Sequence, residues 1–188
     1  MRVTESGNGT AARAENGWAI RLAQVTARLA EHRFTSHDGD SLVEAVVDGN
    51  GDPVAVVLTN RAVRLLSEAA LGARVVAALD RARARADEVA GPLLAERLGA
   101  VLPGAAPDLA EDRELAAVET AYDPTGTVAA TVNAHGELYD VRLARRVLEL
   151  DRTVLAARIA AAETAAYHAA LRSWADSARY RRSRPNPG

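Results

Sequence analysis

The chain has 188 residues, no cysteine and a formal net charge of −2 at pH 7. The absence of cysteine excludes disulfides and thiolate metal sites and favours a cytoplasmic location. The acidic balance argues against a globally basic nucleic-acid binder, and no apolar run is long enough to span a membrane. All 23 basic residues are arginine, which together with the abundant alanine indicates a GC-rich genome.

The N-terminal part of the chain predicts a tail, a helix and a short strand. Residues 1–16 are polar and contain glycine, so we expect a disordered tail without the apolar core of a signal peptide. Four apolar residues then recur at helical spacing: Trp18, Leu22, Val25 and Leu29. This helix is expected to end near Arg33, before a strand over 34–37 and a turn over 38–41.

Residues 42–58, with the sequence LVEAVVDGNGDPVAVVL, predict a β-hairpin. Valine, alanine and leucine alternate along both arms, which is typical of half-buried strands. Residues 48–51 contain Asp-Gly and Asn-Gly, which tolerate positive φ and favour a tight turn. Pro53 lacks an N–H and therefore suits the first residue of a strand.

The hairpin leads into a helix expected from about Arg61 to Val89, with Thr59 or Asn60 as N-cap. Its apolar stripe has six members: Leu71, Val75, Leu79, Ala82, Ala86 and Val89. Gly72 weakens a helix by about 1 kcal/mol relative to alanine, so a break between Arg64 and Leu71 is plausible. Gly91-Pro92 is expected to end this helix.

The hairpin occurs twice, because residues 127–143 align with 42–58 at a shift of 85 without a gap. The matched pairs are Val43 and Val128, Ala45 and Ala130, Val47 and Val132, Gly51 and Gly136, Val56 and Val141, and Leu58 and Leu143. The helices that follow match at a shift of 84, where 71–74 meets 155–158. We interpret this as an internal duplication.

The second copy is expected to repeat the first. A short connecting helix over 93–102 and a Pro-rich linker over 103–107 come before it, and Asp108 is a candidate cap for a helix over 109–119. A strand at 121–122, a turn and the second hairpin then lead into a last helix from about Arg145 to Arg179. The stripe of that helix is Leu155, Ile159, Ala162, Ala166, Ala170 and Trp174. Narrow, alanine-rich stripes predict packing against another helix.

The first hairpin at 42–58 and the alanine-rich helix at 71–86 resemble the YbaB/EbfC family of small nucleoid-associated proteins. The resemblance covers about residues 17–177 and is looser in the second half, where Ala134 replaces Gly49. It implies an α-β-β-β-α fold, dimerisation through the sheets, and helices that project as a clamp on DNA. It also implies an actinobacterial form, since relatives such as EspL accompany type VII secretion genes.

The predicted fold is therefore α+β, with two tandem α-β-β-β-α units packed as an intrachain pseudo-dimer. The expected segments are a tail (1–16), a first repeat (17–91), a linker (92–107), a second repeat (108–177) and a basic disordered tail (178–188). The valines and leucines of both hairpins are expected to face one shared core. Whether whole chains associate further through the sheets is left open.

The sequence holds no constellation for catalysis, a cofactor or a metal. The four histidines, His32, His37, His135 and His168, lack metal-site spacing. The aspartates around the first hairpin lack the ligand pattern of a calcium loop, and the glycines form no phosphate-binding loop. We therefore expect a protein that is not an enzyme.

Arginines are the candidate nucleic-acid-binding residues. The clearest set is at the C-terminus: Arg179, Arg181, Arg182 and Arg184. Arg81 and Arg85 are candidates on the first long helix, although alternating arginines there cannot form one row and also fit a solvated face. A basic tail can hold DNA through counterion release, and it also fits a solubilising role.

Two functions follow from these observations. The first is nucleoid-associated binding of duplex DNA with little sequence specificity. The alternative is a protein-interaction or chaperone-like scaffold, associated with type VII secretion, that has lost DNA binding. The charge on the projecting helices discriminates the two, because DNA requires a coherent positive face and a protein partner fits a mixed or acidic one.

Overall fold

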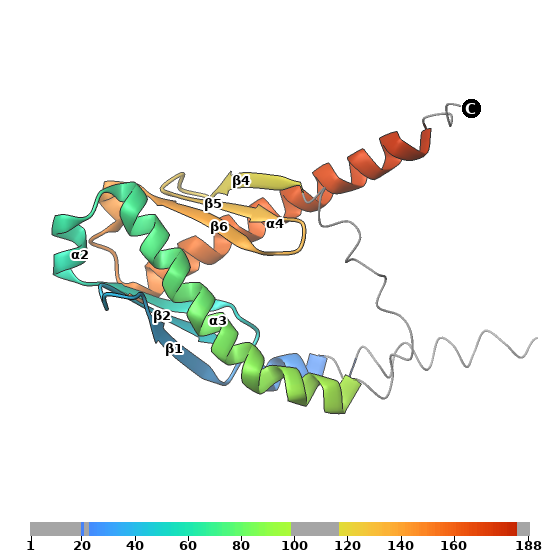
Figure 1. The fold of residues 1–188 in the computed structure, drawn as a ribbon, viewed down its shortest axis with the longest axis horizontal. Coiled ribbons are helices and arrows are strands. Elements are labelled where there is room, and N and C mark those ends of the chain that lie inside the picture. The colour runs from blue at the N-terminus through green and yellow to red at the C-terminus, as the bar shows by residue number, and fades with distance from the viewer. Residues whose placement is uncertain (1–19, 21–22, 99–116, 184–188) are drawn as a thin grey trace, which may run out of the picture.

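The computed structural model describes residues 20, 23–98 and 117–183, with only the backbone described for 93–98 and 177–183. Within these ranges the chain folds into two three-stranded antiparallel sheets with long helices (Figure 1), which confirms the α+β class. The strand orders are β1-β2-β3 and β4-β5-β6. No helix in the described ranges is long and apolar enough to cross a membrane.

The first half follows the predicted order. Residues 23–29 are helical, and β1 (Arg33–His37), β2 (Val43–Asp48) and β3 (Pro53–Leu58) form the first sheet. The Thr59 side chain caps α2 (Asn60–Leu65) by accepting from the Ala62 N–H. A break then separates α2 from α3 (Glu68–Leu98), as expected from Gly72.

The second half contains β4 (Val118–Tyr122), β5 (Val128–Asn133) and β6 (Leu138–Leu143). A single 3-10 turn, η2 (Arg145–Val147), stands where the first half has α2. The last helix, α4 (Arg152–Ser183), then runs to the end of the described chain. The predicted helix over 109–119 is partly wrong, since Val118 and Glu119 are the start of β4; residues 109–116 lie outside the described residues.

Each long helix contacts both sheets. Helix α3 lies on β1 and β2 and also contacts β6, while α4 lies on β4 and β5 and also contacts β3. The close approach of α3 to β6 requires Gly72, because an added Cβ would lie 1.8 Å from the Val141 carbonyl oxygen. The alanine-rich stripes therefore serve packing on the sheets, and the expected helix-on-helix packing is not the principal contact.

One hydrophobic core joins the two halves, as predicted. The eight expected core residues of the hairpins all belong to it or pack against it: Val43, Val47, Val56, Leu58, Val128, Val132, Val141 and Leu143. The buried stripes of α3 and α4 add leucine, valine, isoleucine and alanine to the same cluster. Val89 is exposed, and Ala90 occupies the buried position instead.

The turns of the two halves repeat the same hydrogen bonds at a shift of 85. The N–H groups of Gly51 and Gly136 donate to the carbonyls of Asp48 and Asn133, at 3.1 and 3.0 Å. Both glycines have a φ of 84°. The ladder irregularities also correspond, lying between residues 46 and 47 in one hairpin and 131 and 132 in the other.

Two helix ends differ from the predictions. Helix α3 does not stop at Gly91-Pro92 but continues through Pro92 to Leu98. The residues after the proline, Leu-Leu-Ala-Glu-Arg-Leu, have high helix propensities that offset the cost of the proline. Helix α4 extends to Ser183, so the segment 178–183 continues the helix where a disordered tail was expected. Its Ala, Arg and Tyr residues include no helix breaker before Pro185.

Candidate nucleic-acid interface

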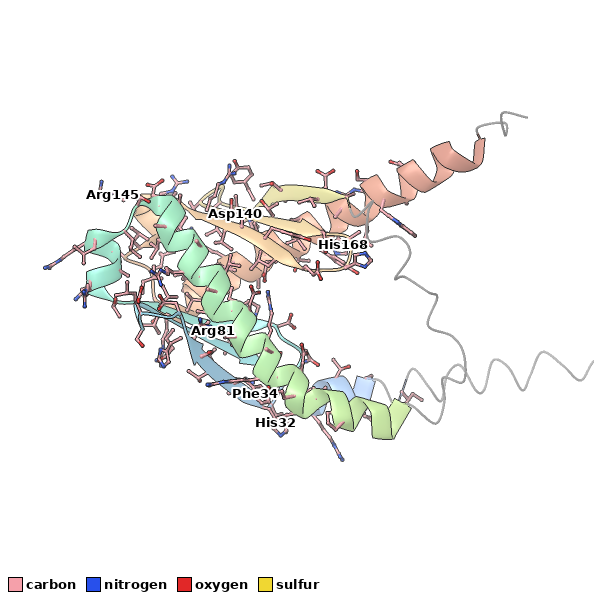
Figure 2. All side chains as sticks on the ribbon, viewed as in Figure 1. His32, Phe34, Arg81, Asp140, Arg145 and His168 are labelled. Carbon is pink, nitrogen blue, oxygen red and sulfur yellow. The ribbon has the colours of Figure 1, made fainter. Side chains whose placement is uncertain are left out.

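A row of arginines runs along one side of α3. Arg74, Arg81 and Arg85 are spaced by seven and four residues, which places them on one face of the helix. Arg81 donates to the His37 carbonyl (3.1 Å) and Arg85 to the Thr35 carbonyl (2.6 Å), both on the outer edge of β1. Arg81 lies beside α3 next to the first sheet (Figure 2), and its side chain is exposed. Guanidinium groups have five N–H donors each, so these contacts leave donors free for phosphate oxygens.

Arg74 begins the row with an ion-pair cluster. Its guanidinium lies 3.1 Å from the buried carboxylate of Asp38 and 2.5 Å from that of Asp40. Burial alone would raise the pKa of Asp38, but hydrogen bonds from the Val43, Leu42 and Asp40 N–H groups, with the charge of Arg74, lower it overall. Arg74 is therefore neutralised, and the free positive charge of the row lies at Arg81 and Arg85.

The second half has an equivalent of the buried Asp38 carboxylate but no equivalent of the arginine row on α3. Asp123 is buried and accepts from the N–H groups of Thr127 (2.6 Å) and Val128 (2.8 Å). Arg158, the counterpart of Arg74, donates to the hydroxyls of Thr125 and Thr127. At a shift of 84, the positions that match Arg81 and Arg85 are Ala165 and Ala169.

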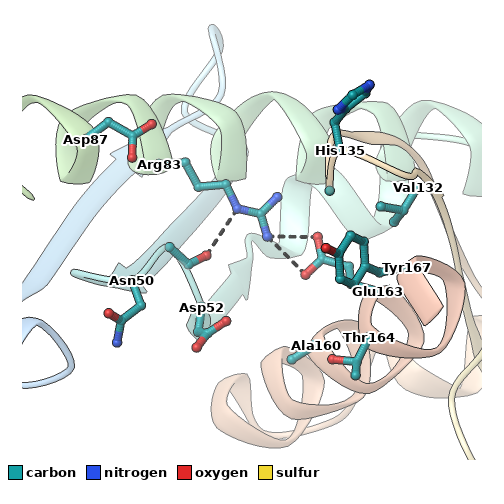
Figure 3. Close-up of a pocket in the computed structure, with 12 residues that line it drawn as sticks. Asn50, Asp52, Arg83, Asp87, Val132, His135, Ala160, Glu163, Thr164 and Tyr167 are labelled. Atoms are coloured by element: carbon teal, nitrogen blue, oxygen red, sulfur yellow. Dashed lines mark hydrogen bonds and ion pairs between the residues drawn. The ribbon is translucent and has the colours of Figure 1, made fainter. Parts of the chain in front are cut away.

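A cleft of about 600 Å³ lies between α3, α4 and the two hairpin turns (Figure 3). Arg83 crosses it, donating through Nε to the Gly51 carbonyl (3.1 Å) and through one terminal nitrogen to both carboxylate oxygens of Glu163 (2.8 and 3.0 Å). Arg83 and Glu163 thus join the two halves, and both side chains are largely buried, at 24% and 13% exposed.

The cleft is acidic. Asp52, Asp87 and Glu163 line it against the single arginine Arg83. Burial raises the pKa of Glu163, Arg83 opposes that shift, and Asp52 and Asp80 add to it. A surface with three carboxylates and one guanidinium repels a polyanion, so the cleft between the helices does not suit a phosphate backbone.

The remaining candidates lie at the other end of the chain. Arg179, Arg181 and Arg182 are positions in the last two turns of α4, and Arg184 lies outside the described residues. The C-terminal ends of α3 and α4 point apart in Figure 1. The structure therefore brings Arg81 and Arg85 together but does not bring them to the arginines of α4.

Sequence reasoning did not single out Arg74 or Glu163, and it did not predict the contact of Arg83 with Glu163. Arg74 belongs to the row, and its spacing to Arg81 and Arg85 was a signal in the sequence. Arg83 and Glu163 are 80 residues apart, and no local pattern predicts their contact. In the described part of the chain, no group of three or more histidines, aspartates and glutamates has the geometry of a metal site.

Comparison with known proteins gives one match. The sequence model of the YbaB/EbfC DNA-binding family matches residues 13–100, a stretch that includes the first sheet, α2 and α3. No curated protein and no solved structure matches the chain. The match supports the resemblance found in the first half.

Proposed function

We propose that this protein binds duplex DNA with little sequence specificity and acts as a nucleoid-associated protein of the cytoplasm, without enzymatic activity. The observation that carries the proposal is the family match over residues 13–100, which contain the exposed pair Arg81 and Arg85. Phosphate contacts by arginine supply most of the affinity in sequence-independent binding.

The DNA contacts are assigned to the β1 side of α3 and to the end of α4. Arg81 and Arg85 are one helical turn apart and present their charge beside the edge of the first sheet. The β1 carbonyls hold both guanidinium groups in place, which lowers the entropy cost of binding a phosphate. Arg179, Arg181, Arg182 and Arg184 would add contacts from the C-terminal segment.

We further infer that the chain is an intrachain pseudo-dimer produced by tandem duplication, in an actinobacterial form of the family. The support is the repeat of turn hydrogen bonds at a shift of 85 and the crosswise contacts of α3 with β6 and α4 with β3. In such a pseudo-dimer each half completes the core of the other, so neither needs a second chain to bury its apolar face.

The experiment is a fluorescence-anisotropy titration of duplex DNA at about 50 mM salt, where phosphate contacts are strong. Arg81→Gln with Arg85→Gln keeps amide donors near the β1 carbonyls and removes two charges. Arg61→Gln with Arg64→Gln, on the exposed helix α2, removes the same charge elsewhere. We expect the first variant to weaken binding at least tenfold and the second to change it by less than about threefold.

A chain that ends at Ala178 tests the second contact region, because it lacks the last arginines of α4. Weaker binding by this chain assigns affinity to the C-terminal segment. Absence of binding by the intact protein at micromolar concentration would contradict DNA binding altogether, and equal effects of the two double variants would contradict the site.

The acidic cleft favours a second candidate function, a protein-interaction or chaperone-like scaffold related to type VII secretion. Asp52, Asp87 and Glu163 would suit a basic amphipathic helix between α3 and α4. A labelled arginine-rich helical peptide provides the probe. This alternative requires that the peptide binds, that Asp87→Asn weakens it, and that the intact protein does not bind DNA.

A further inference from the structure

The outer edge strands of the two sheets, β1 and β4, differ in whether side chains bind their outward carbonyl groups. On β1, Arg81 and Arg85 occupy the carbonyls of His37 and Thr35. On β4 the matching residues are Tyr122 and Thr120, as the strand registers show. Helix α4 has alanine at both arginine positions, and no described side chain donates to these two carbonyls.

The same strand exposes an apolar face. Burial alternates along β4, so Val118, Thr120 and Tyr122 all point away from the core. Val118 is 50% exposed and Tyr122 is 62% exposed. Natural edge strands are commonly blocked by charge, proline or a covering side chain. The single charged residue of β4, Glu119, lies on the opposite face and is half-buried, so it does not block this edge.

We propose that β4 pairs antiparallel with β4 of a second copy of this chain, about a two-fold axis at Thr120. In that register Val118 lies opposite Tyr122 of the other copy, and Thr120 lies opposite its own equivalent. The outward N–H and C=O groups of these three residues complete the ladder. The exposed valine and tyrosine then cover one another as an apolar cross-strand pair.

The charges of β4 fit this register. Glu119 lies opposite Ala121 of the other copy, so the two carboxylates do not face each other across the strands. Ala165 and Ala169 stand on α4 where α3 carries Arg81 and Arg85, so no guanidinium group reaches the β4 carbonyls from these two positions. A contact between two five-residue strands is smaller than a standard interface, and a dissociation constant of about 10–100 μM is expected.

The absence of cysteine from the chain allows a direct test by single-cysteine cross-linking. Directly opposed residues in a hydrogen-bonded antiparallel pair have Cα atoms about 5.5 Å apart, within the range a disulfide spans. Thr120→Cys is therefore expected to form a cross-linked dimer under mild oxidation. Thr35→Cys is the matched control, since it is exposed at the same place on the arginine-covered edge of β1.

We expect the Thr120→Cys chain to cross-link at least ten times faster than the Thr35→Cys chain at equal concentration. A third variant, Glu119→Cys, points to the other face and should also cross-link slowly. Equal rates for Thr120→Cys and Thr35→Cys would overturn the proposal, because collision of exposed thiols would then explain the dimer.

Charge substitutions test the register without a covalent bond. Val118→Lys with Tyr122→Lys places like charges opposite each other, and we expect it to raise the dissociation constant in sedimentation equilibrium at least tenfold. Val118→Glu with Tyr122→Lys places opposite charges in the same register and should recover most of the association. Circular dichroism confirms that each variant is folded. A wild-type chain that stays monomeric up to about 1 mM, well above the expected constant, would overturn the proposal.

Discussion

At the scale of single residues, two buried carboxylates organise the turns that precede the hairpins. Asp38 and Asp123 each accept hydrogen bonds from the first residues of the following strand, β2 or β5. Burial raises the pKa of Asp123, but the hydroxyl of Thr125 and the N–H groups of residues 125, 127 and 128 lower it overall to well below its usual range. The folded chain therefore stabilises the ionised form of Asp123 more than the unfolded chain does.

Asp123→Asn is expected to lower the free energy of unfolding at pH 7 by about 1–3 kcal/mol, since an amide offers one acceptor oxygen where the carboxylate offers two. A lowered pKa stabilises the fold above the unfolded value of 3.8. The difference between variant and wild type should therefore shrink as pH falls below that value. Urea unfolding at several pH values measures it.

Asp140→Asn is the control, because Asp140 lies near the surface in an exposed pair with Arg142. Its effect on unfolding should stay within about 0.5 kcal/mol. An Asp123→Asn effect that is unchanged between pH 7 and pH 3 would contradict the account of this turn.

At the scale of elements, the two glycines of α3 have different roles. An added Cβ at Gly72 would meet the Val141 carbonyl oxygen of β6, whereas one at Gly91 would have no neighbour within 4 Å. The sequence predicts only a weakened helix at Gly72. Its true role depends on a contact with a strand about 70 residues later, which no local pattern reveals.

Gly72→Ala is expected to destabilise the protein by about 3 kcal/mol or more, because a backbone oxygen cannot move aside without separating α3 from β6. Gly91→Ala is the matched change in the same helix. It should stabilise by about 0.5–1 kcal/mol, since alanine favours helix and meets no clash. Thermal and urea unfolding of both variants provide the comparison, and equal effects would refute the close contact.

The hairpins, the first sheet, the α2–α3 break and the shared core could be predicted from the sequence because alternation, turn residues and caps are local signals. The start of β4 could not, since residues 118 and 119 are held in the strand by pairing with β5, which no local pattern reveals. The extent of α4 follows from a local signal, the absence of a helix breaker before Pro185, which the sequence analysis did not use. For the site, the arginines were visible as a set. Their partners on β1 were not, because carbonyl groups carry no sequence signal.

At the scale of the whole molecule, Arg83 and Glu163 form a hydrogen-bonded ion pair between the two halves, beside the apolar core that the halves share in the described part of the chain. Glu163 stands at the position that Leu79, fully buried, occupies in the first half at a shift of 84. Burial raises its pKa despite Arg83. Folding therefore favours the protonated form of Glu163. As the pH falls through its pKa, the contribution of Glu163 to stability increases, whereas that of Asp123 decreases.

A double-mutant cycle with Arg83→Leu and Glu163→Leu measures this link. Each single change leaves a partly buried charge without its partner and should cost about 1–3 kcal/mol. The double change should cost less than the sum, with a coupling free energy of about 1–2 kcal/mol. The exposed Arg142–Asp140 pair is the control, with an expected coupling below about 0.5 kcal/mol. Equal coupling in the two pairs would contradict a link between the halves.

The measurement that tests the central claim most directly is the salt dependence of duplex DNA binding by the intact chain. If Arg81, Arg85 and the C-terminal arginines neutralise phosphates, log K should fall linearly with log salt with a slope of about −3 to −5. The slope should be the same for unrelated DNA sequences and should become shallower by about 2 in the Arg81→Gln, Arg85→Gln variant. Binding that is absent, or that does not respond to salt, would contradict the account.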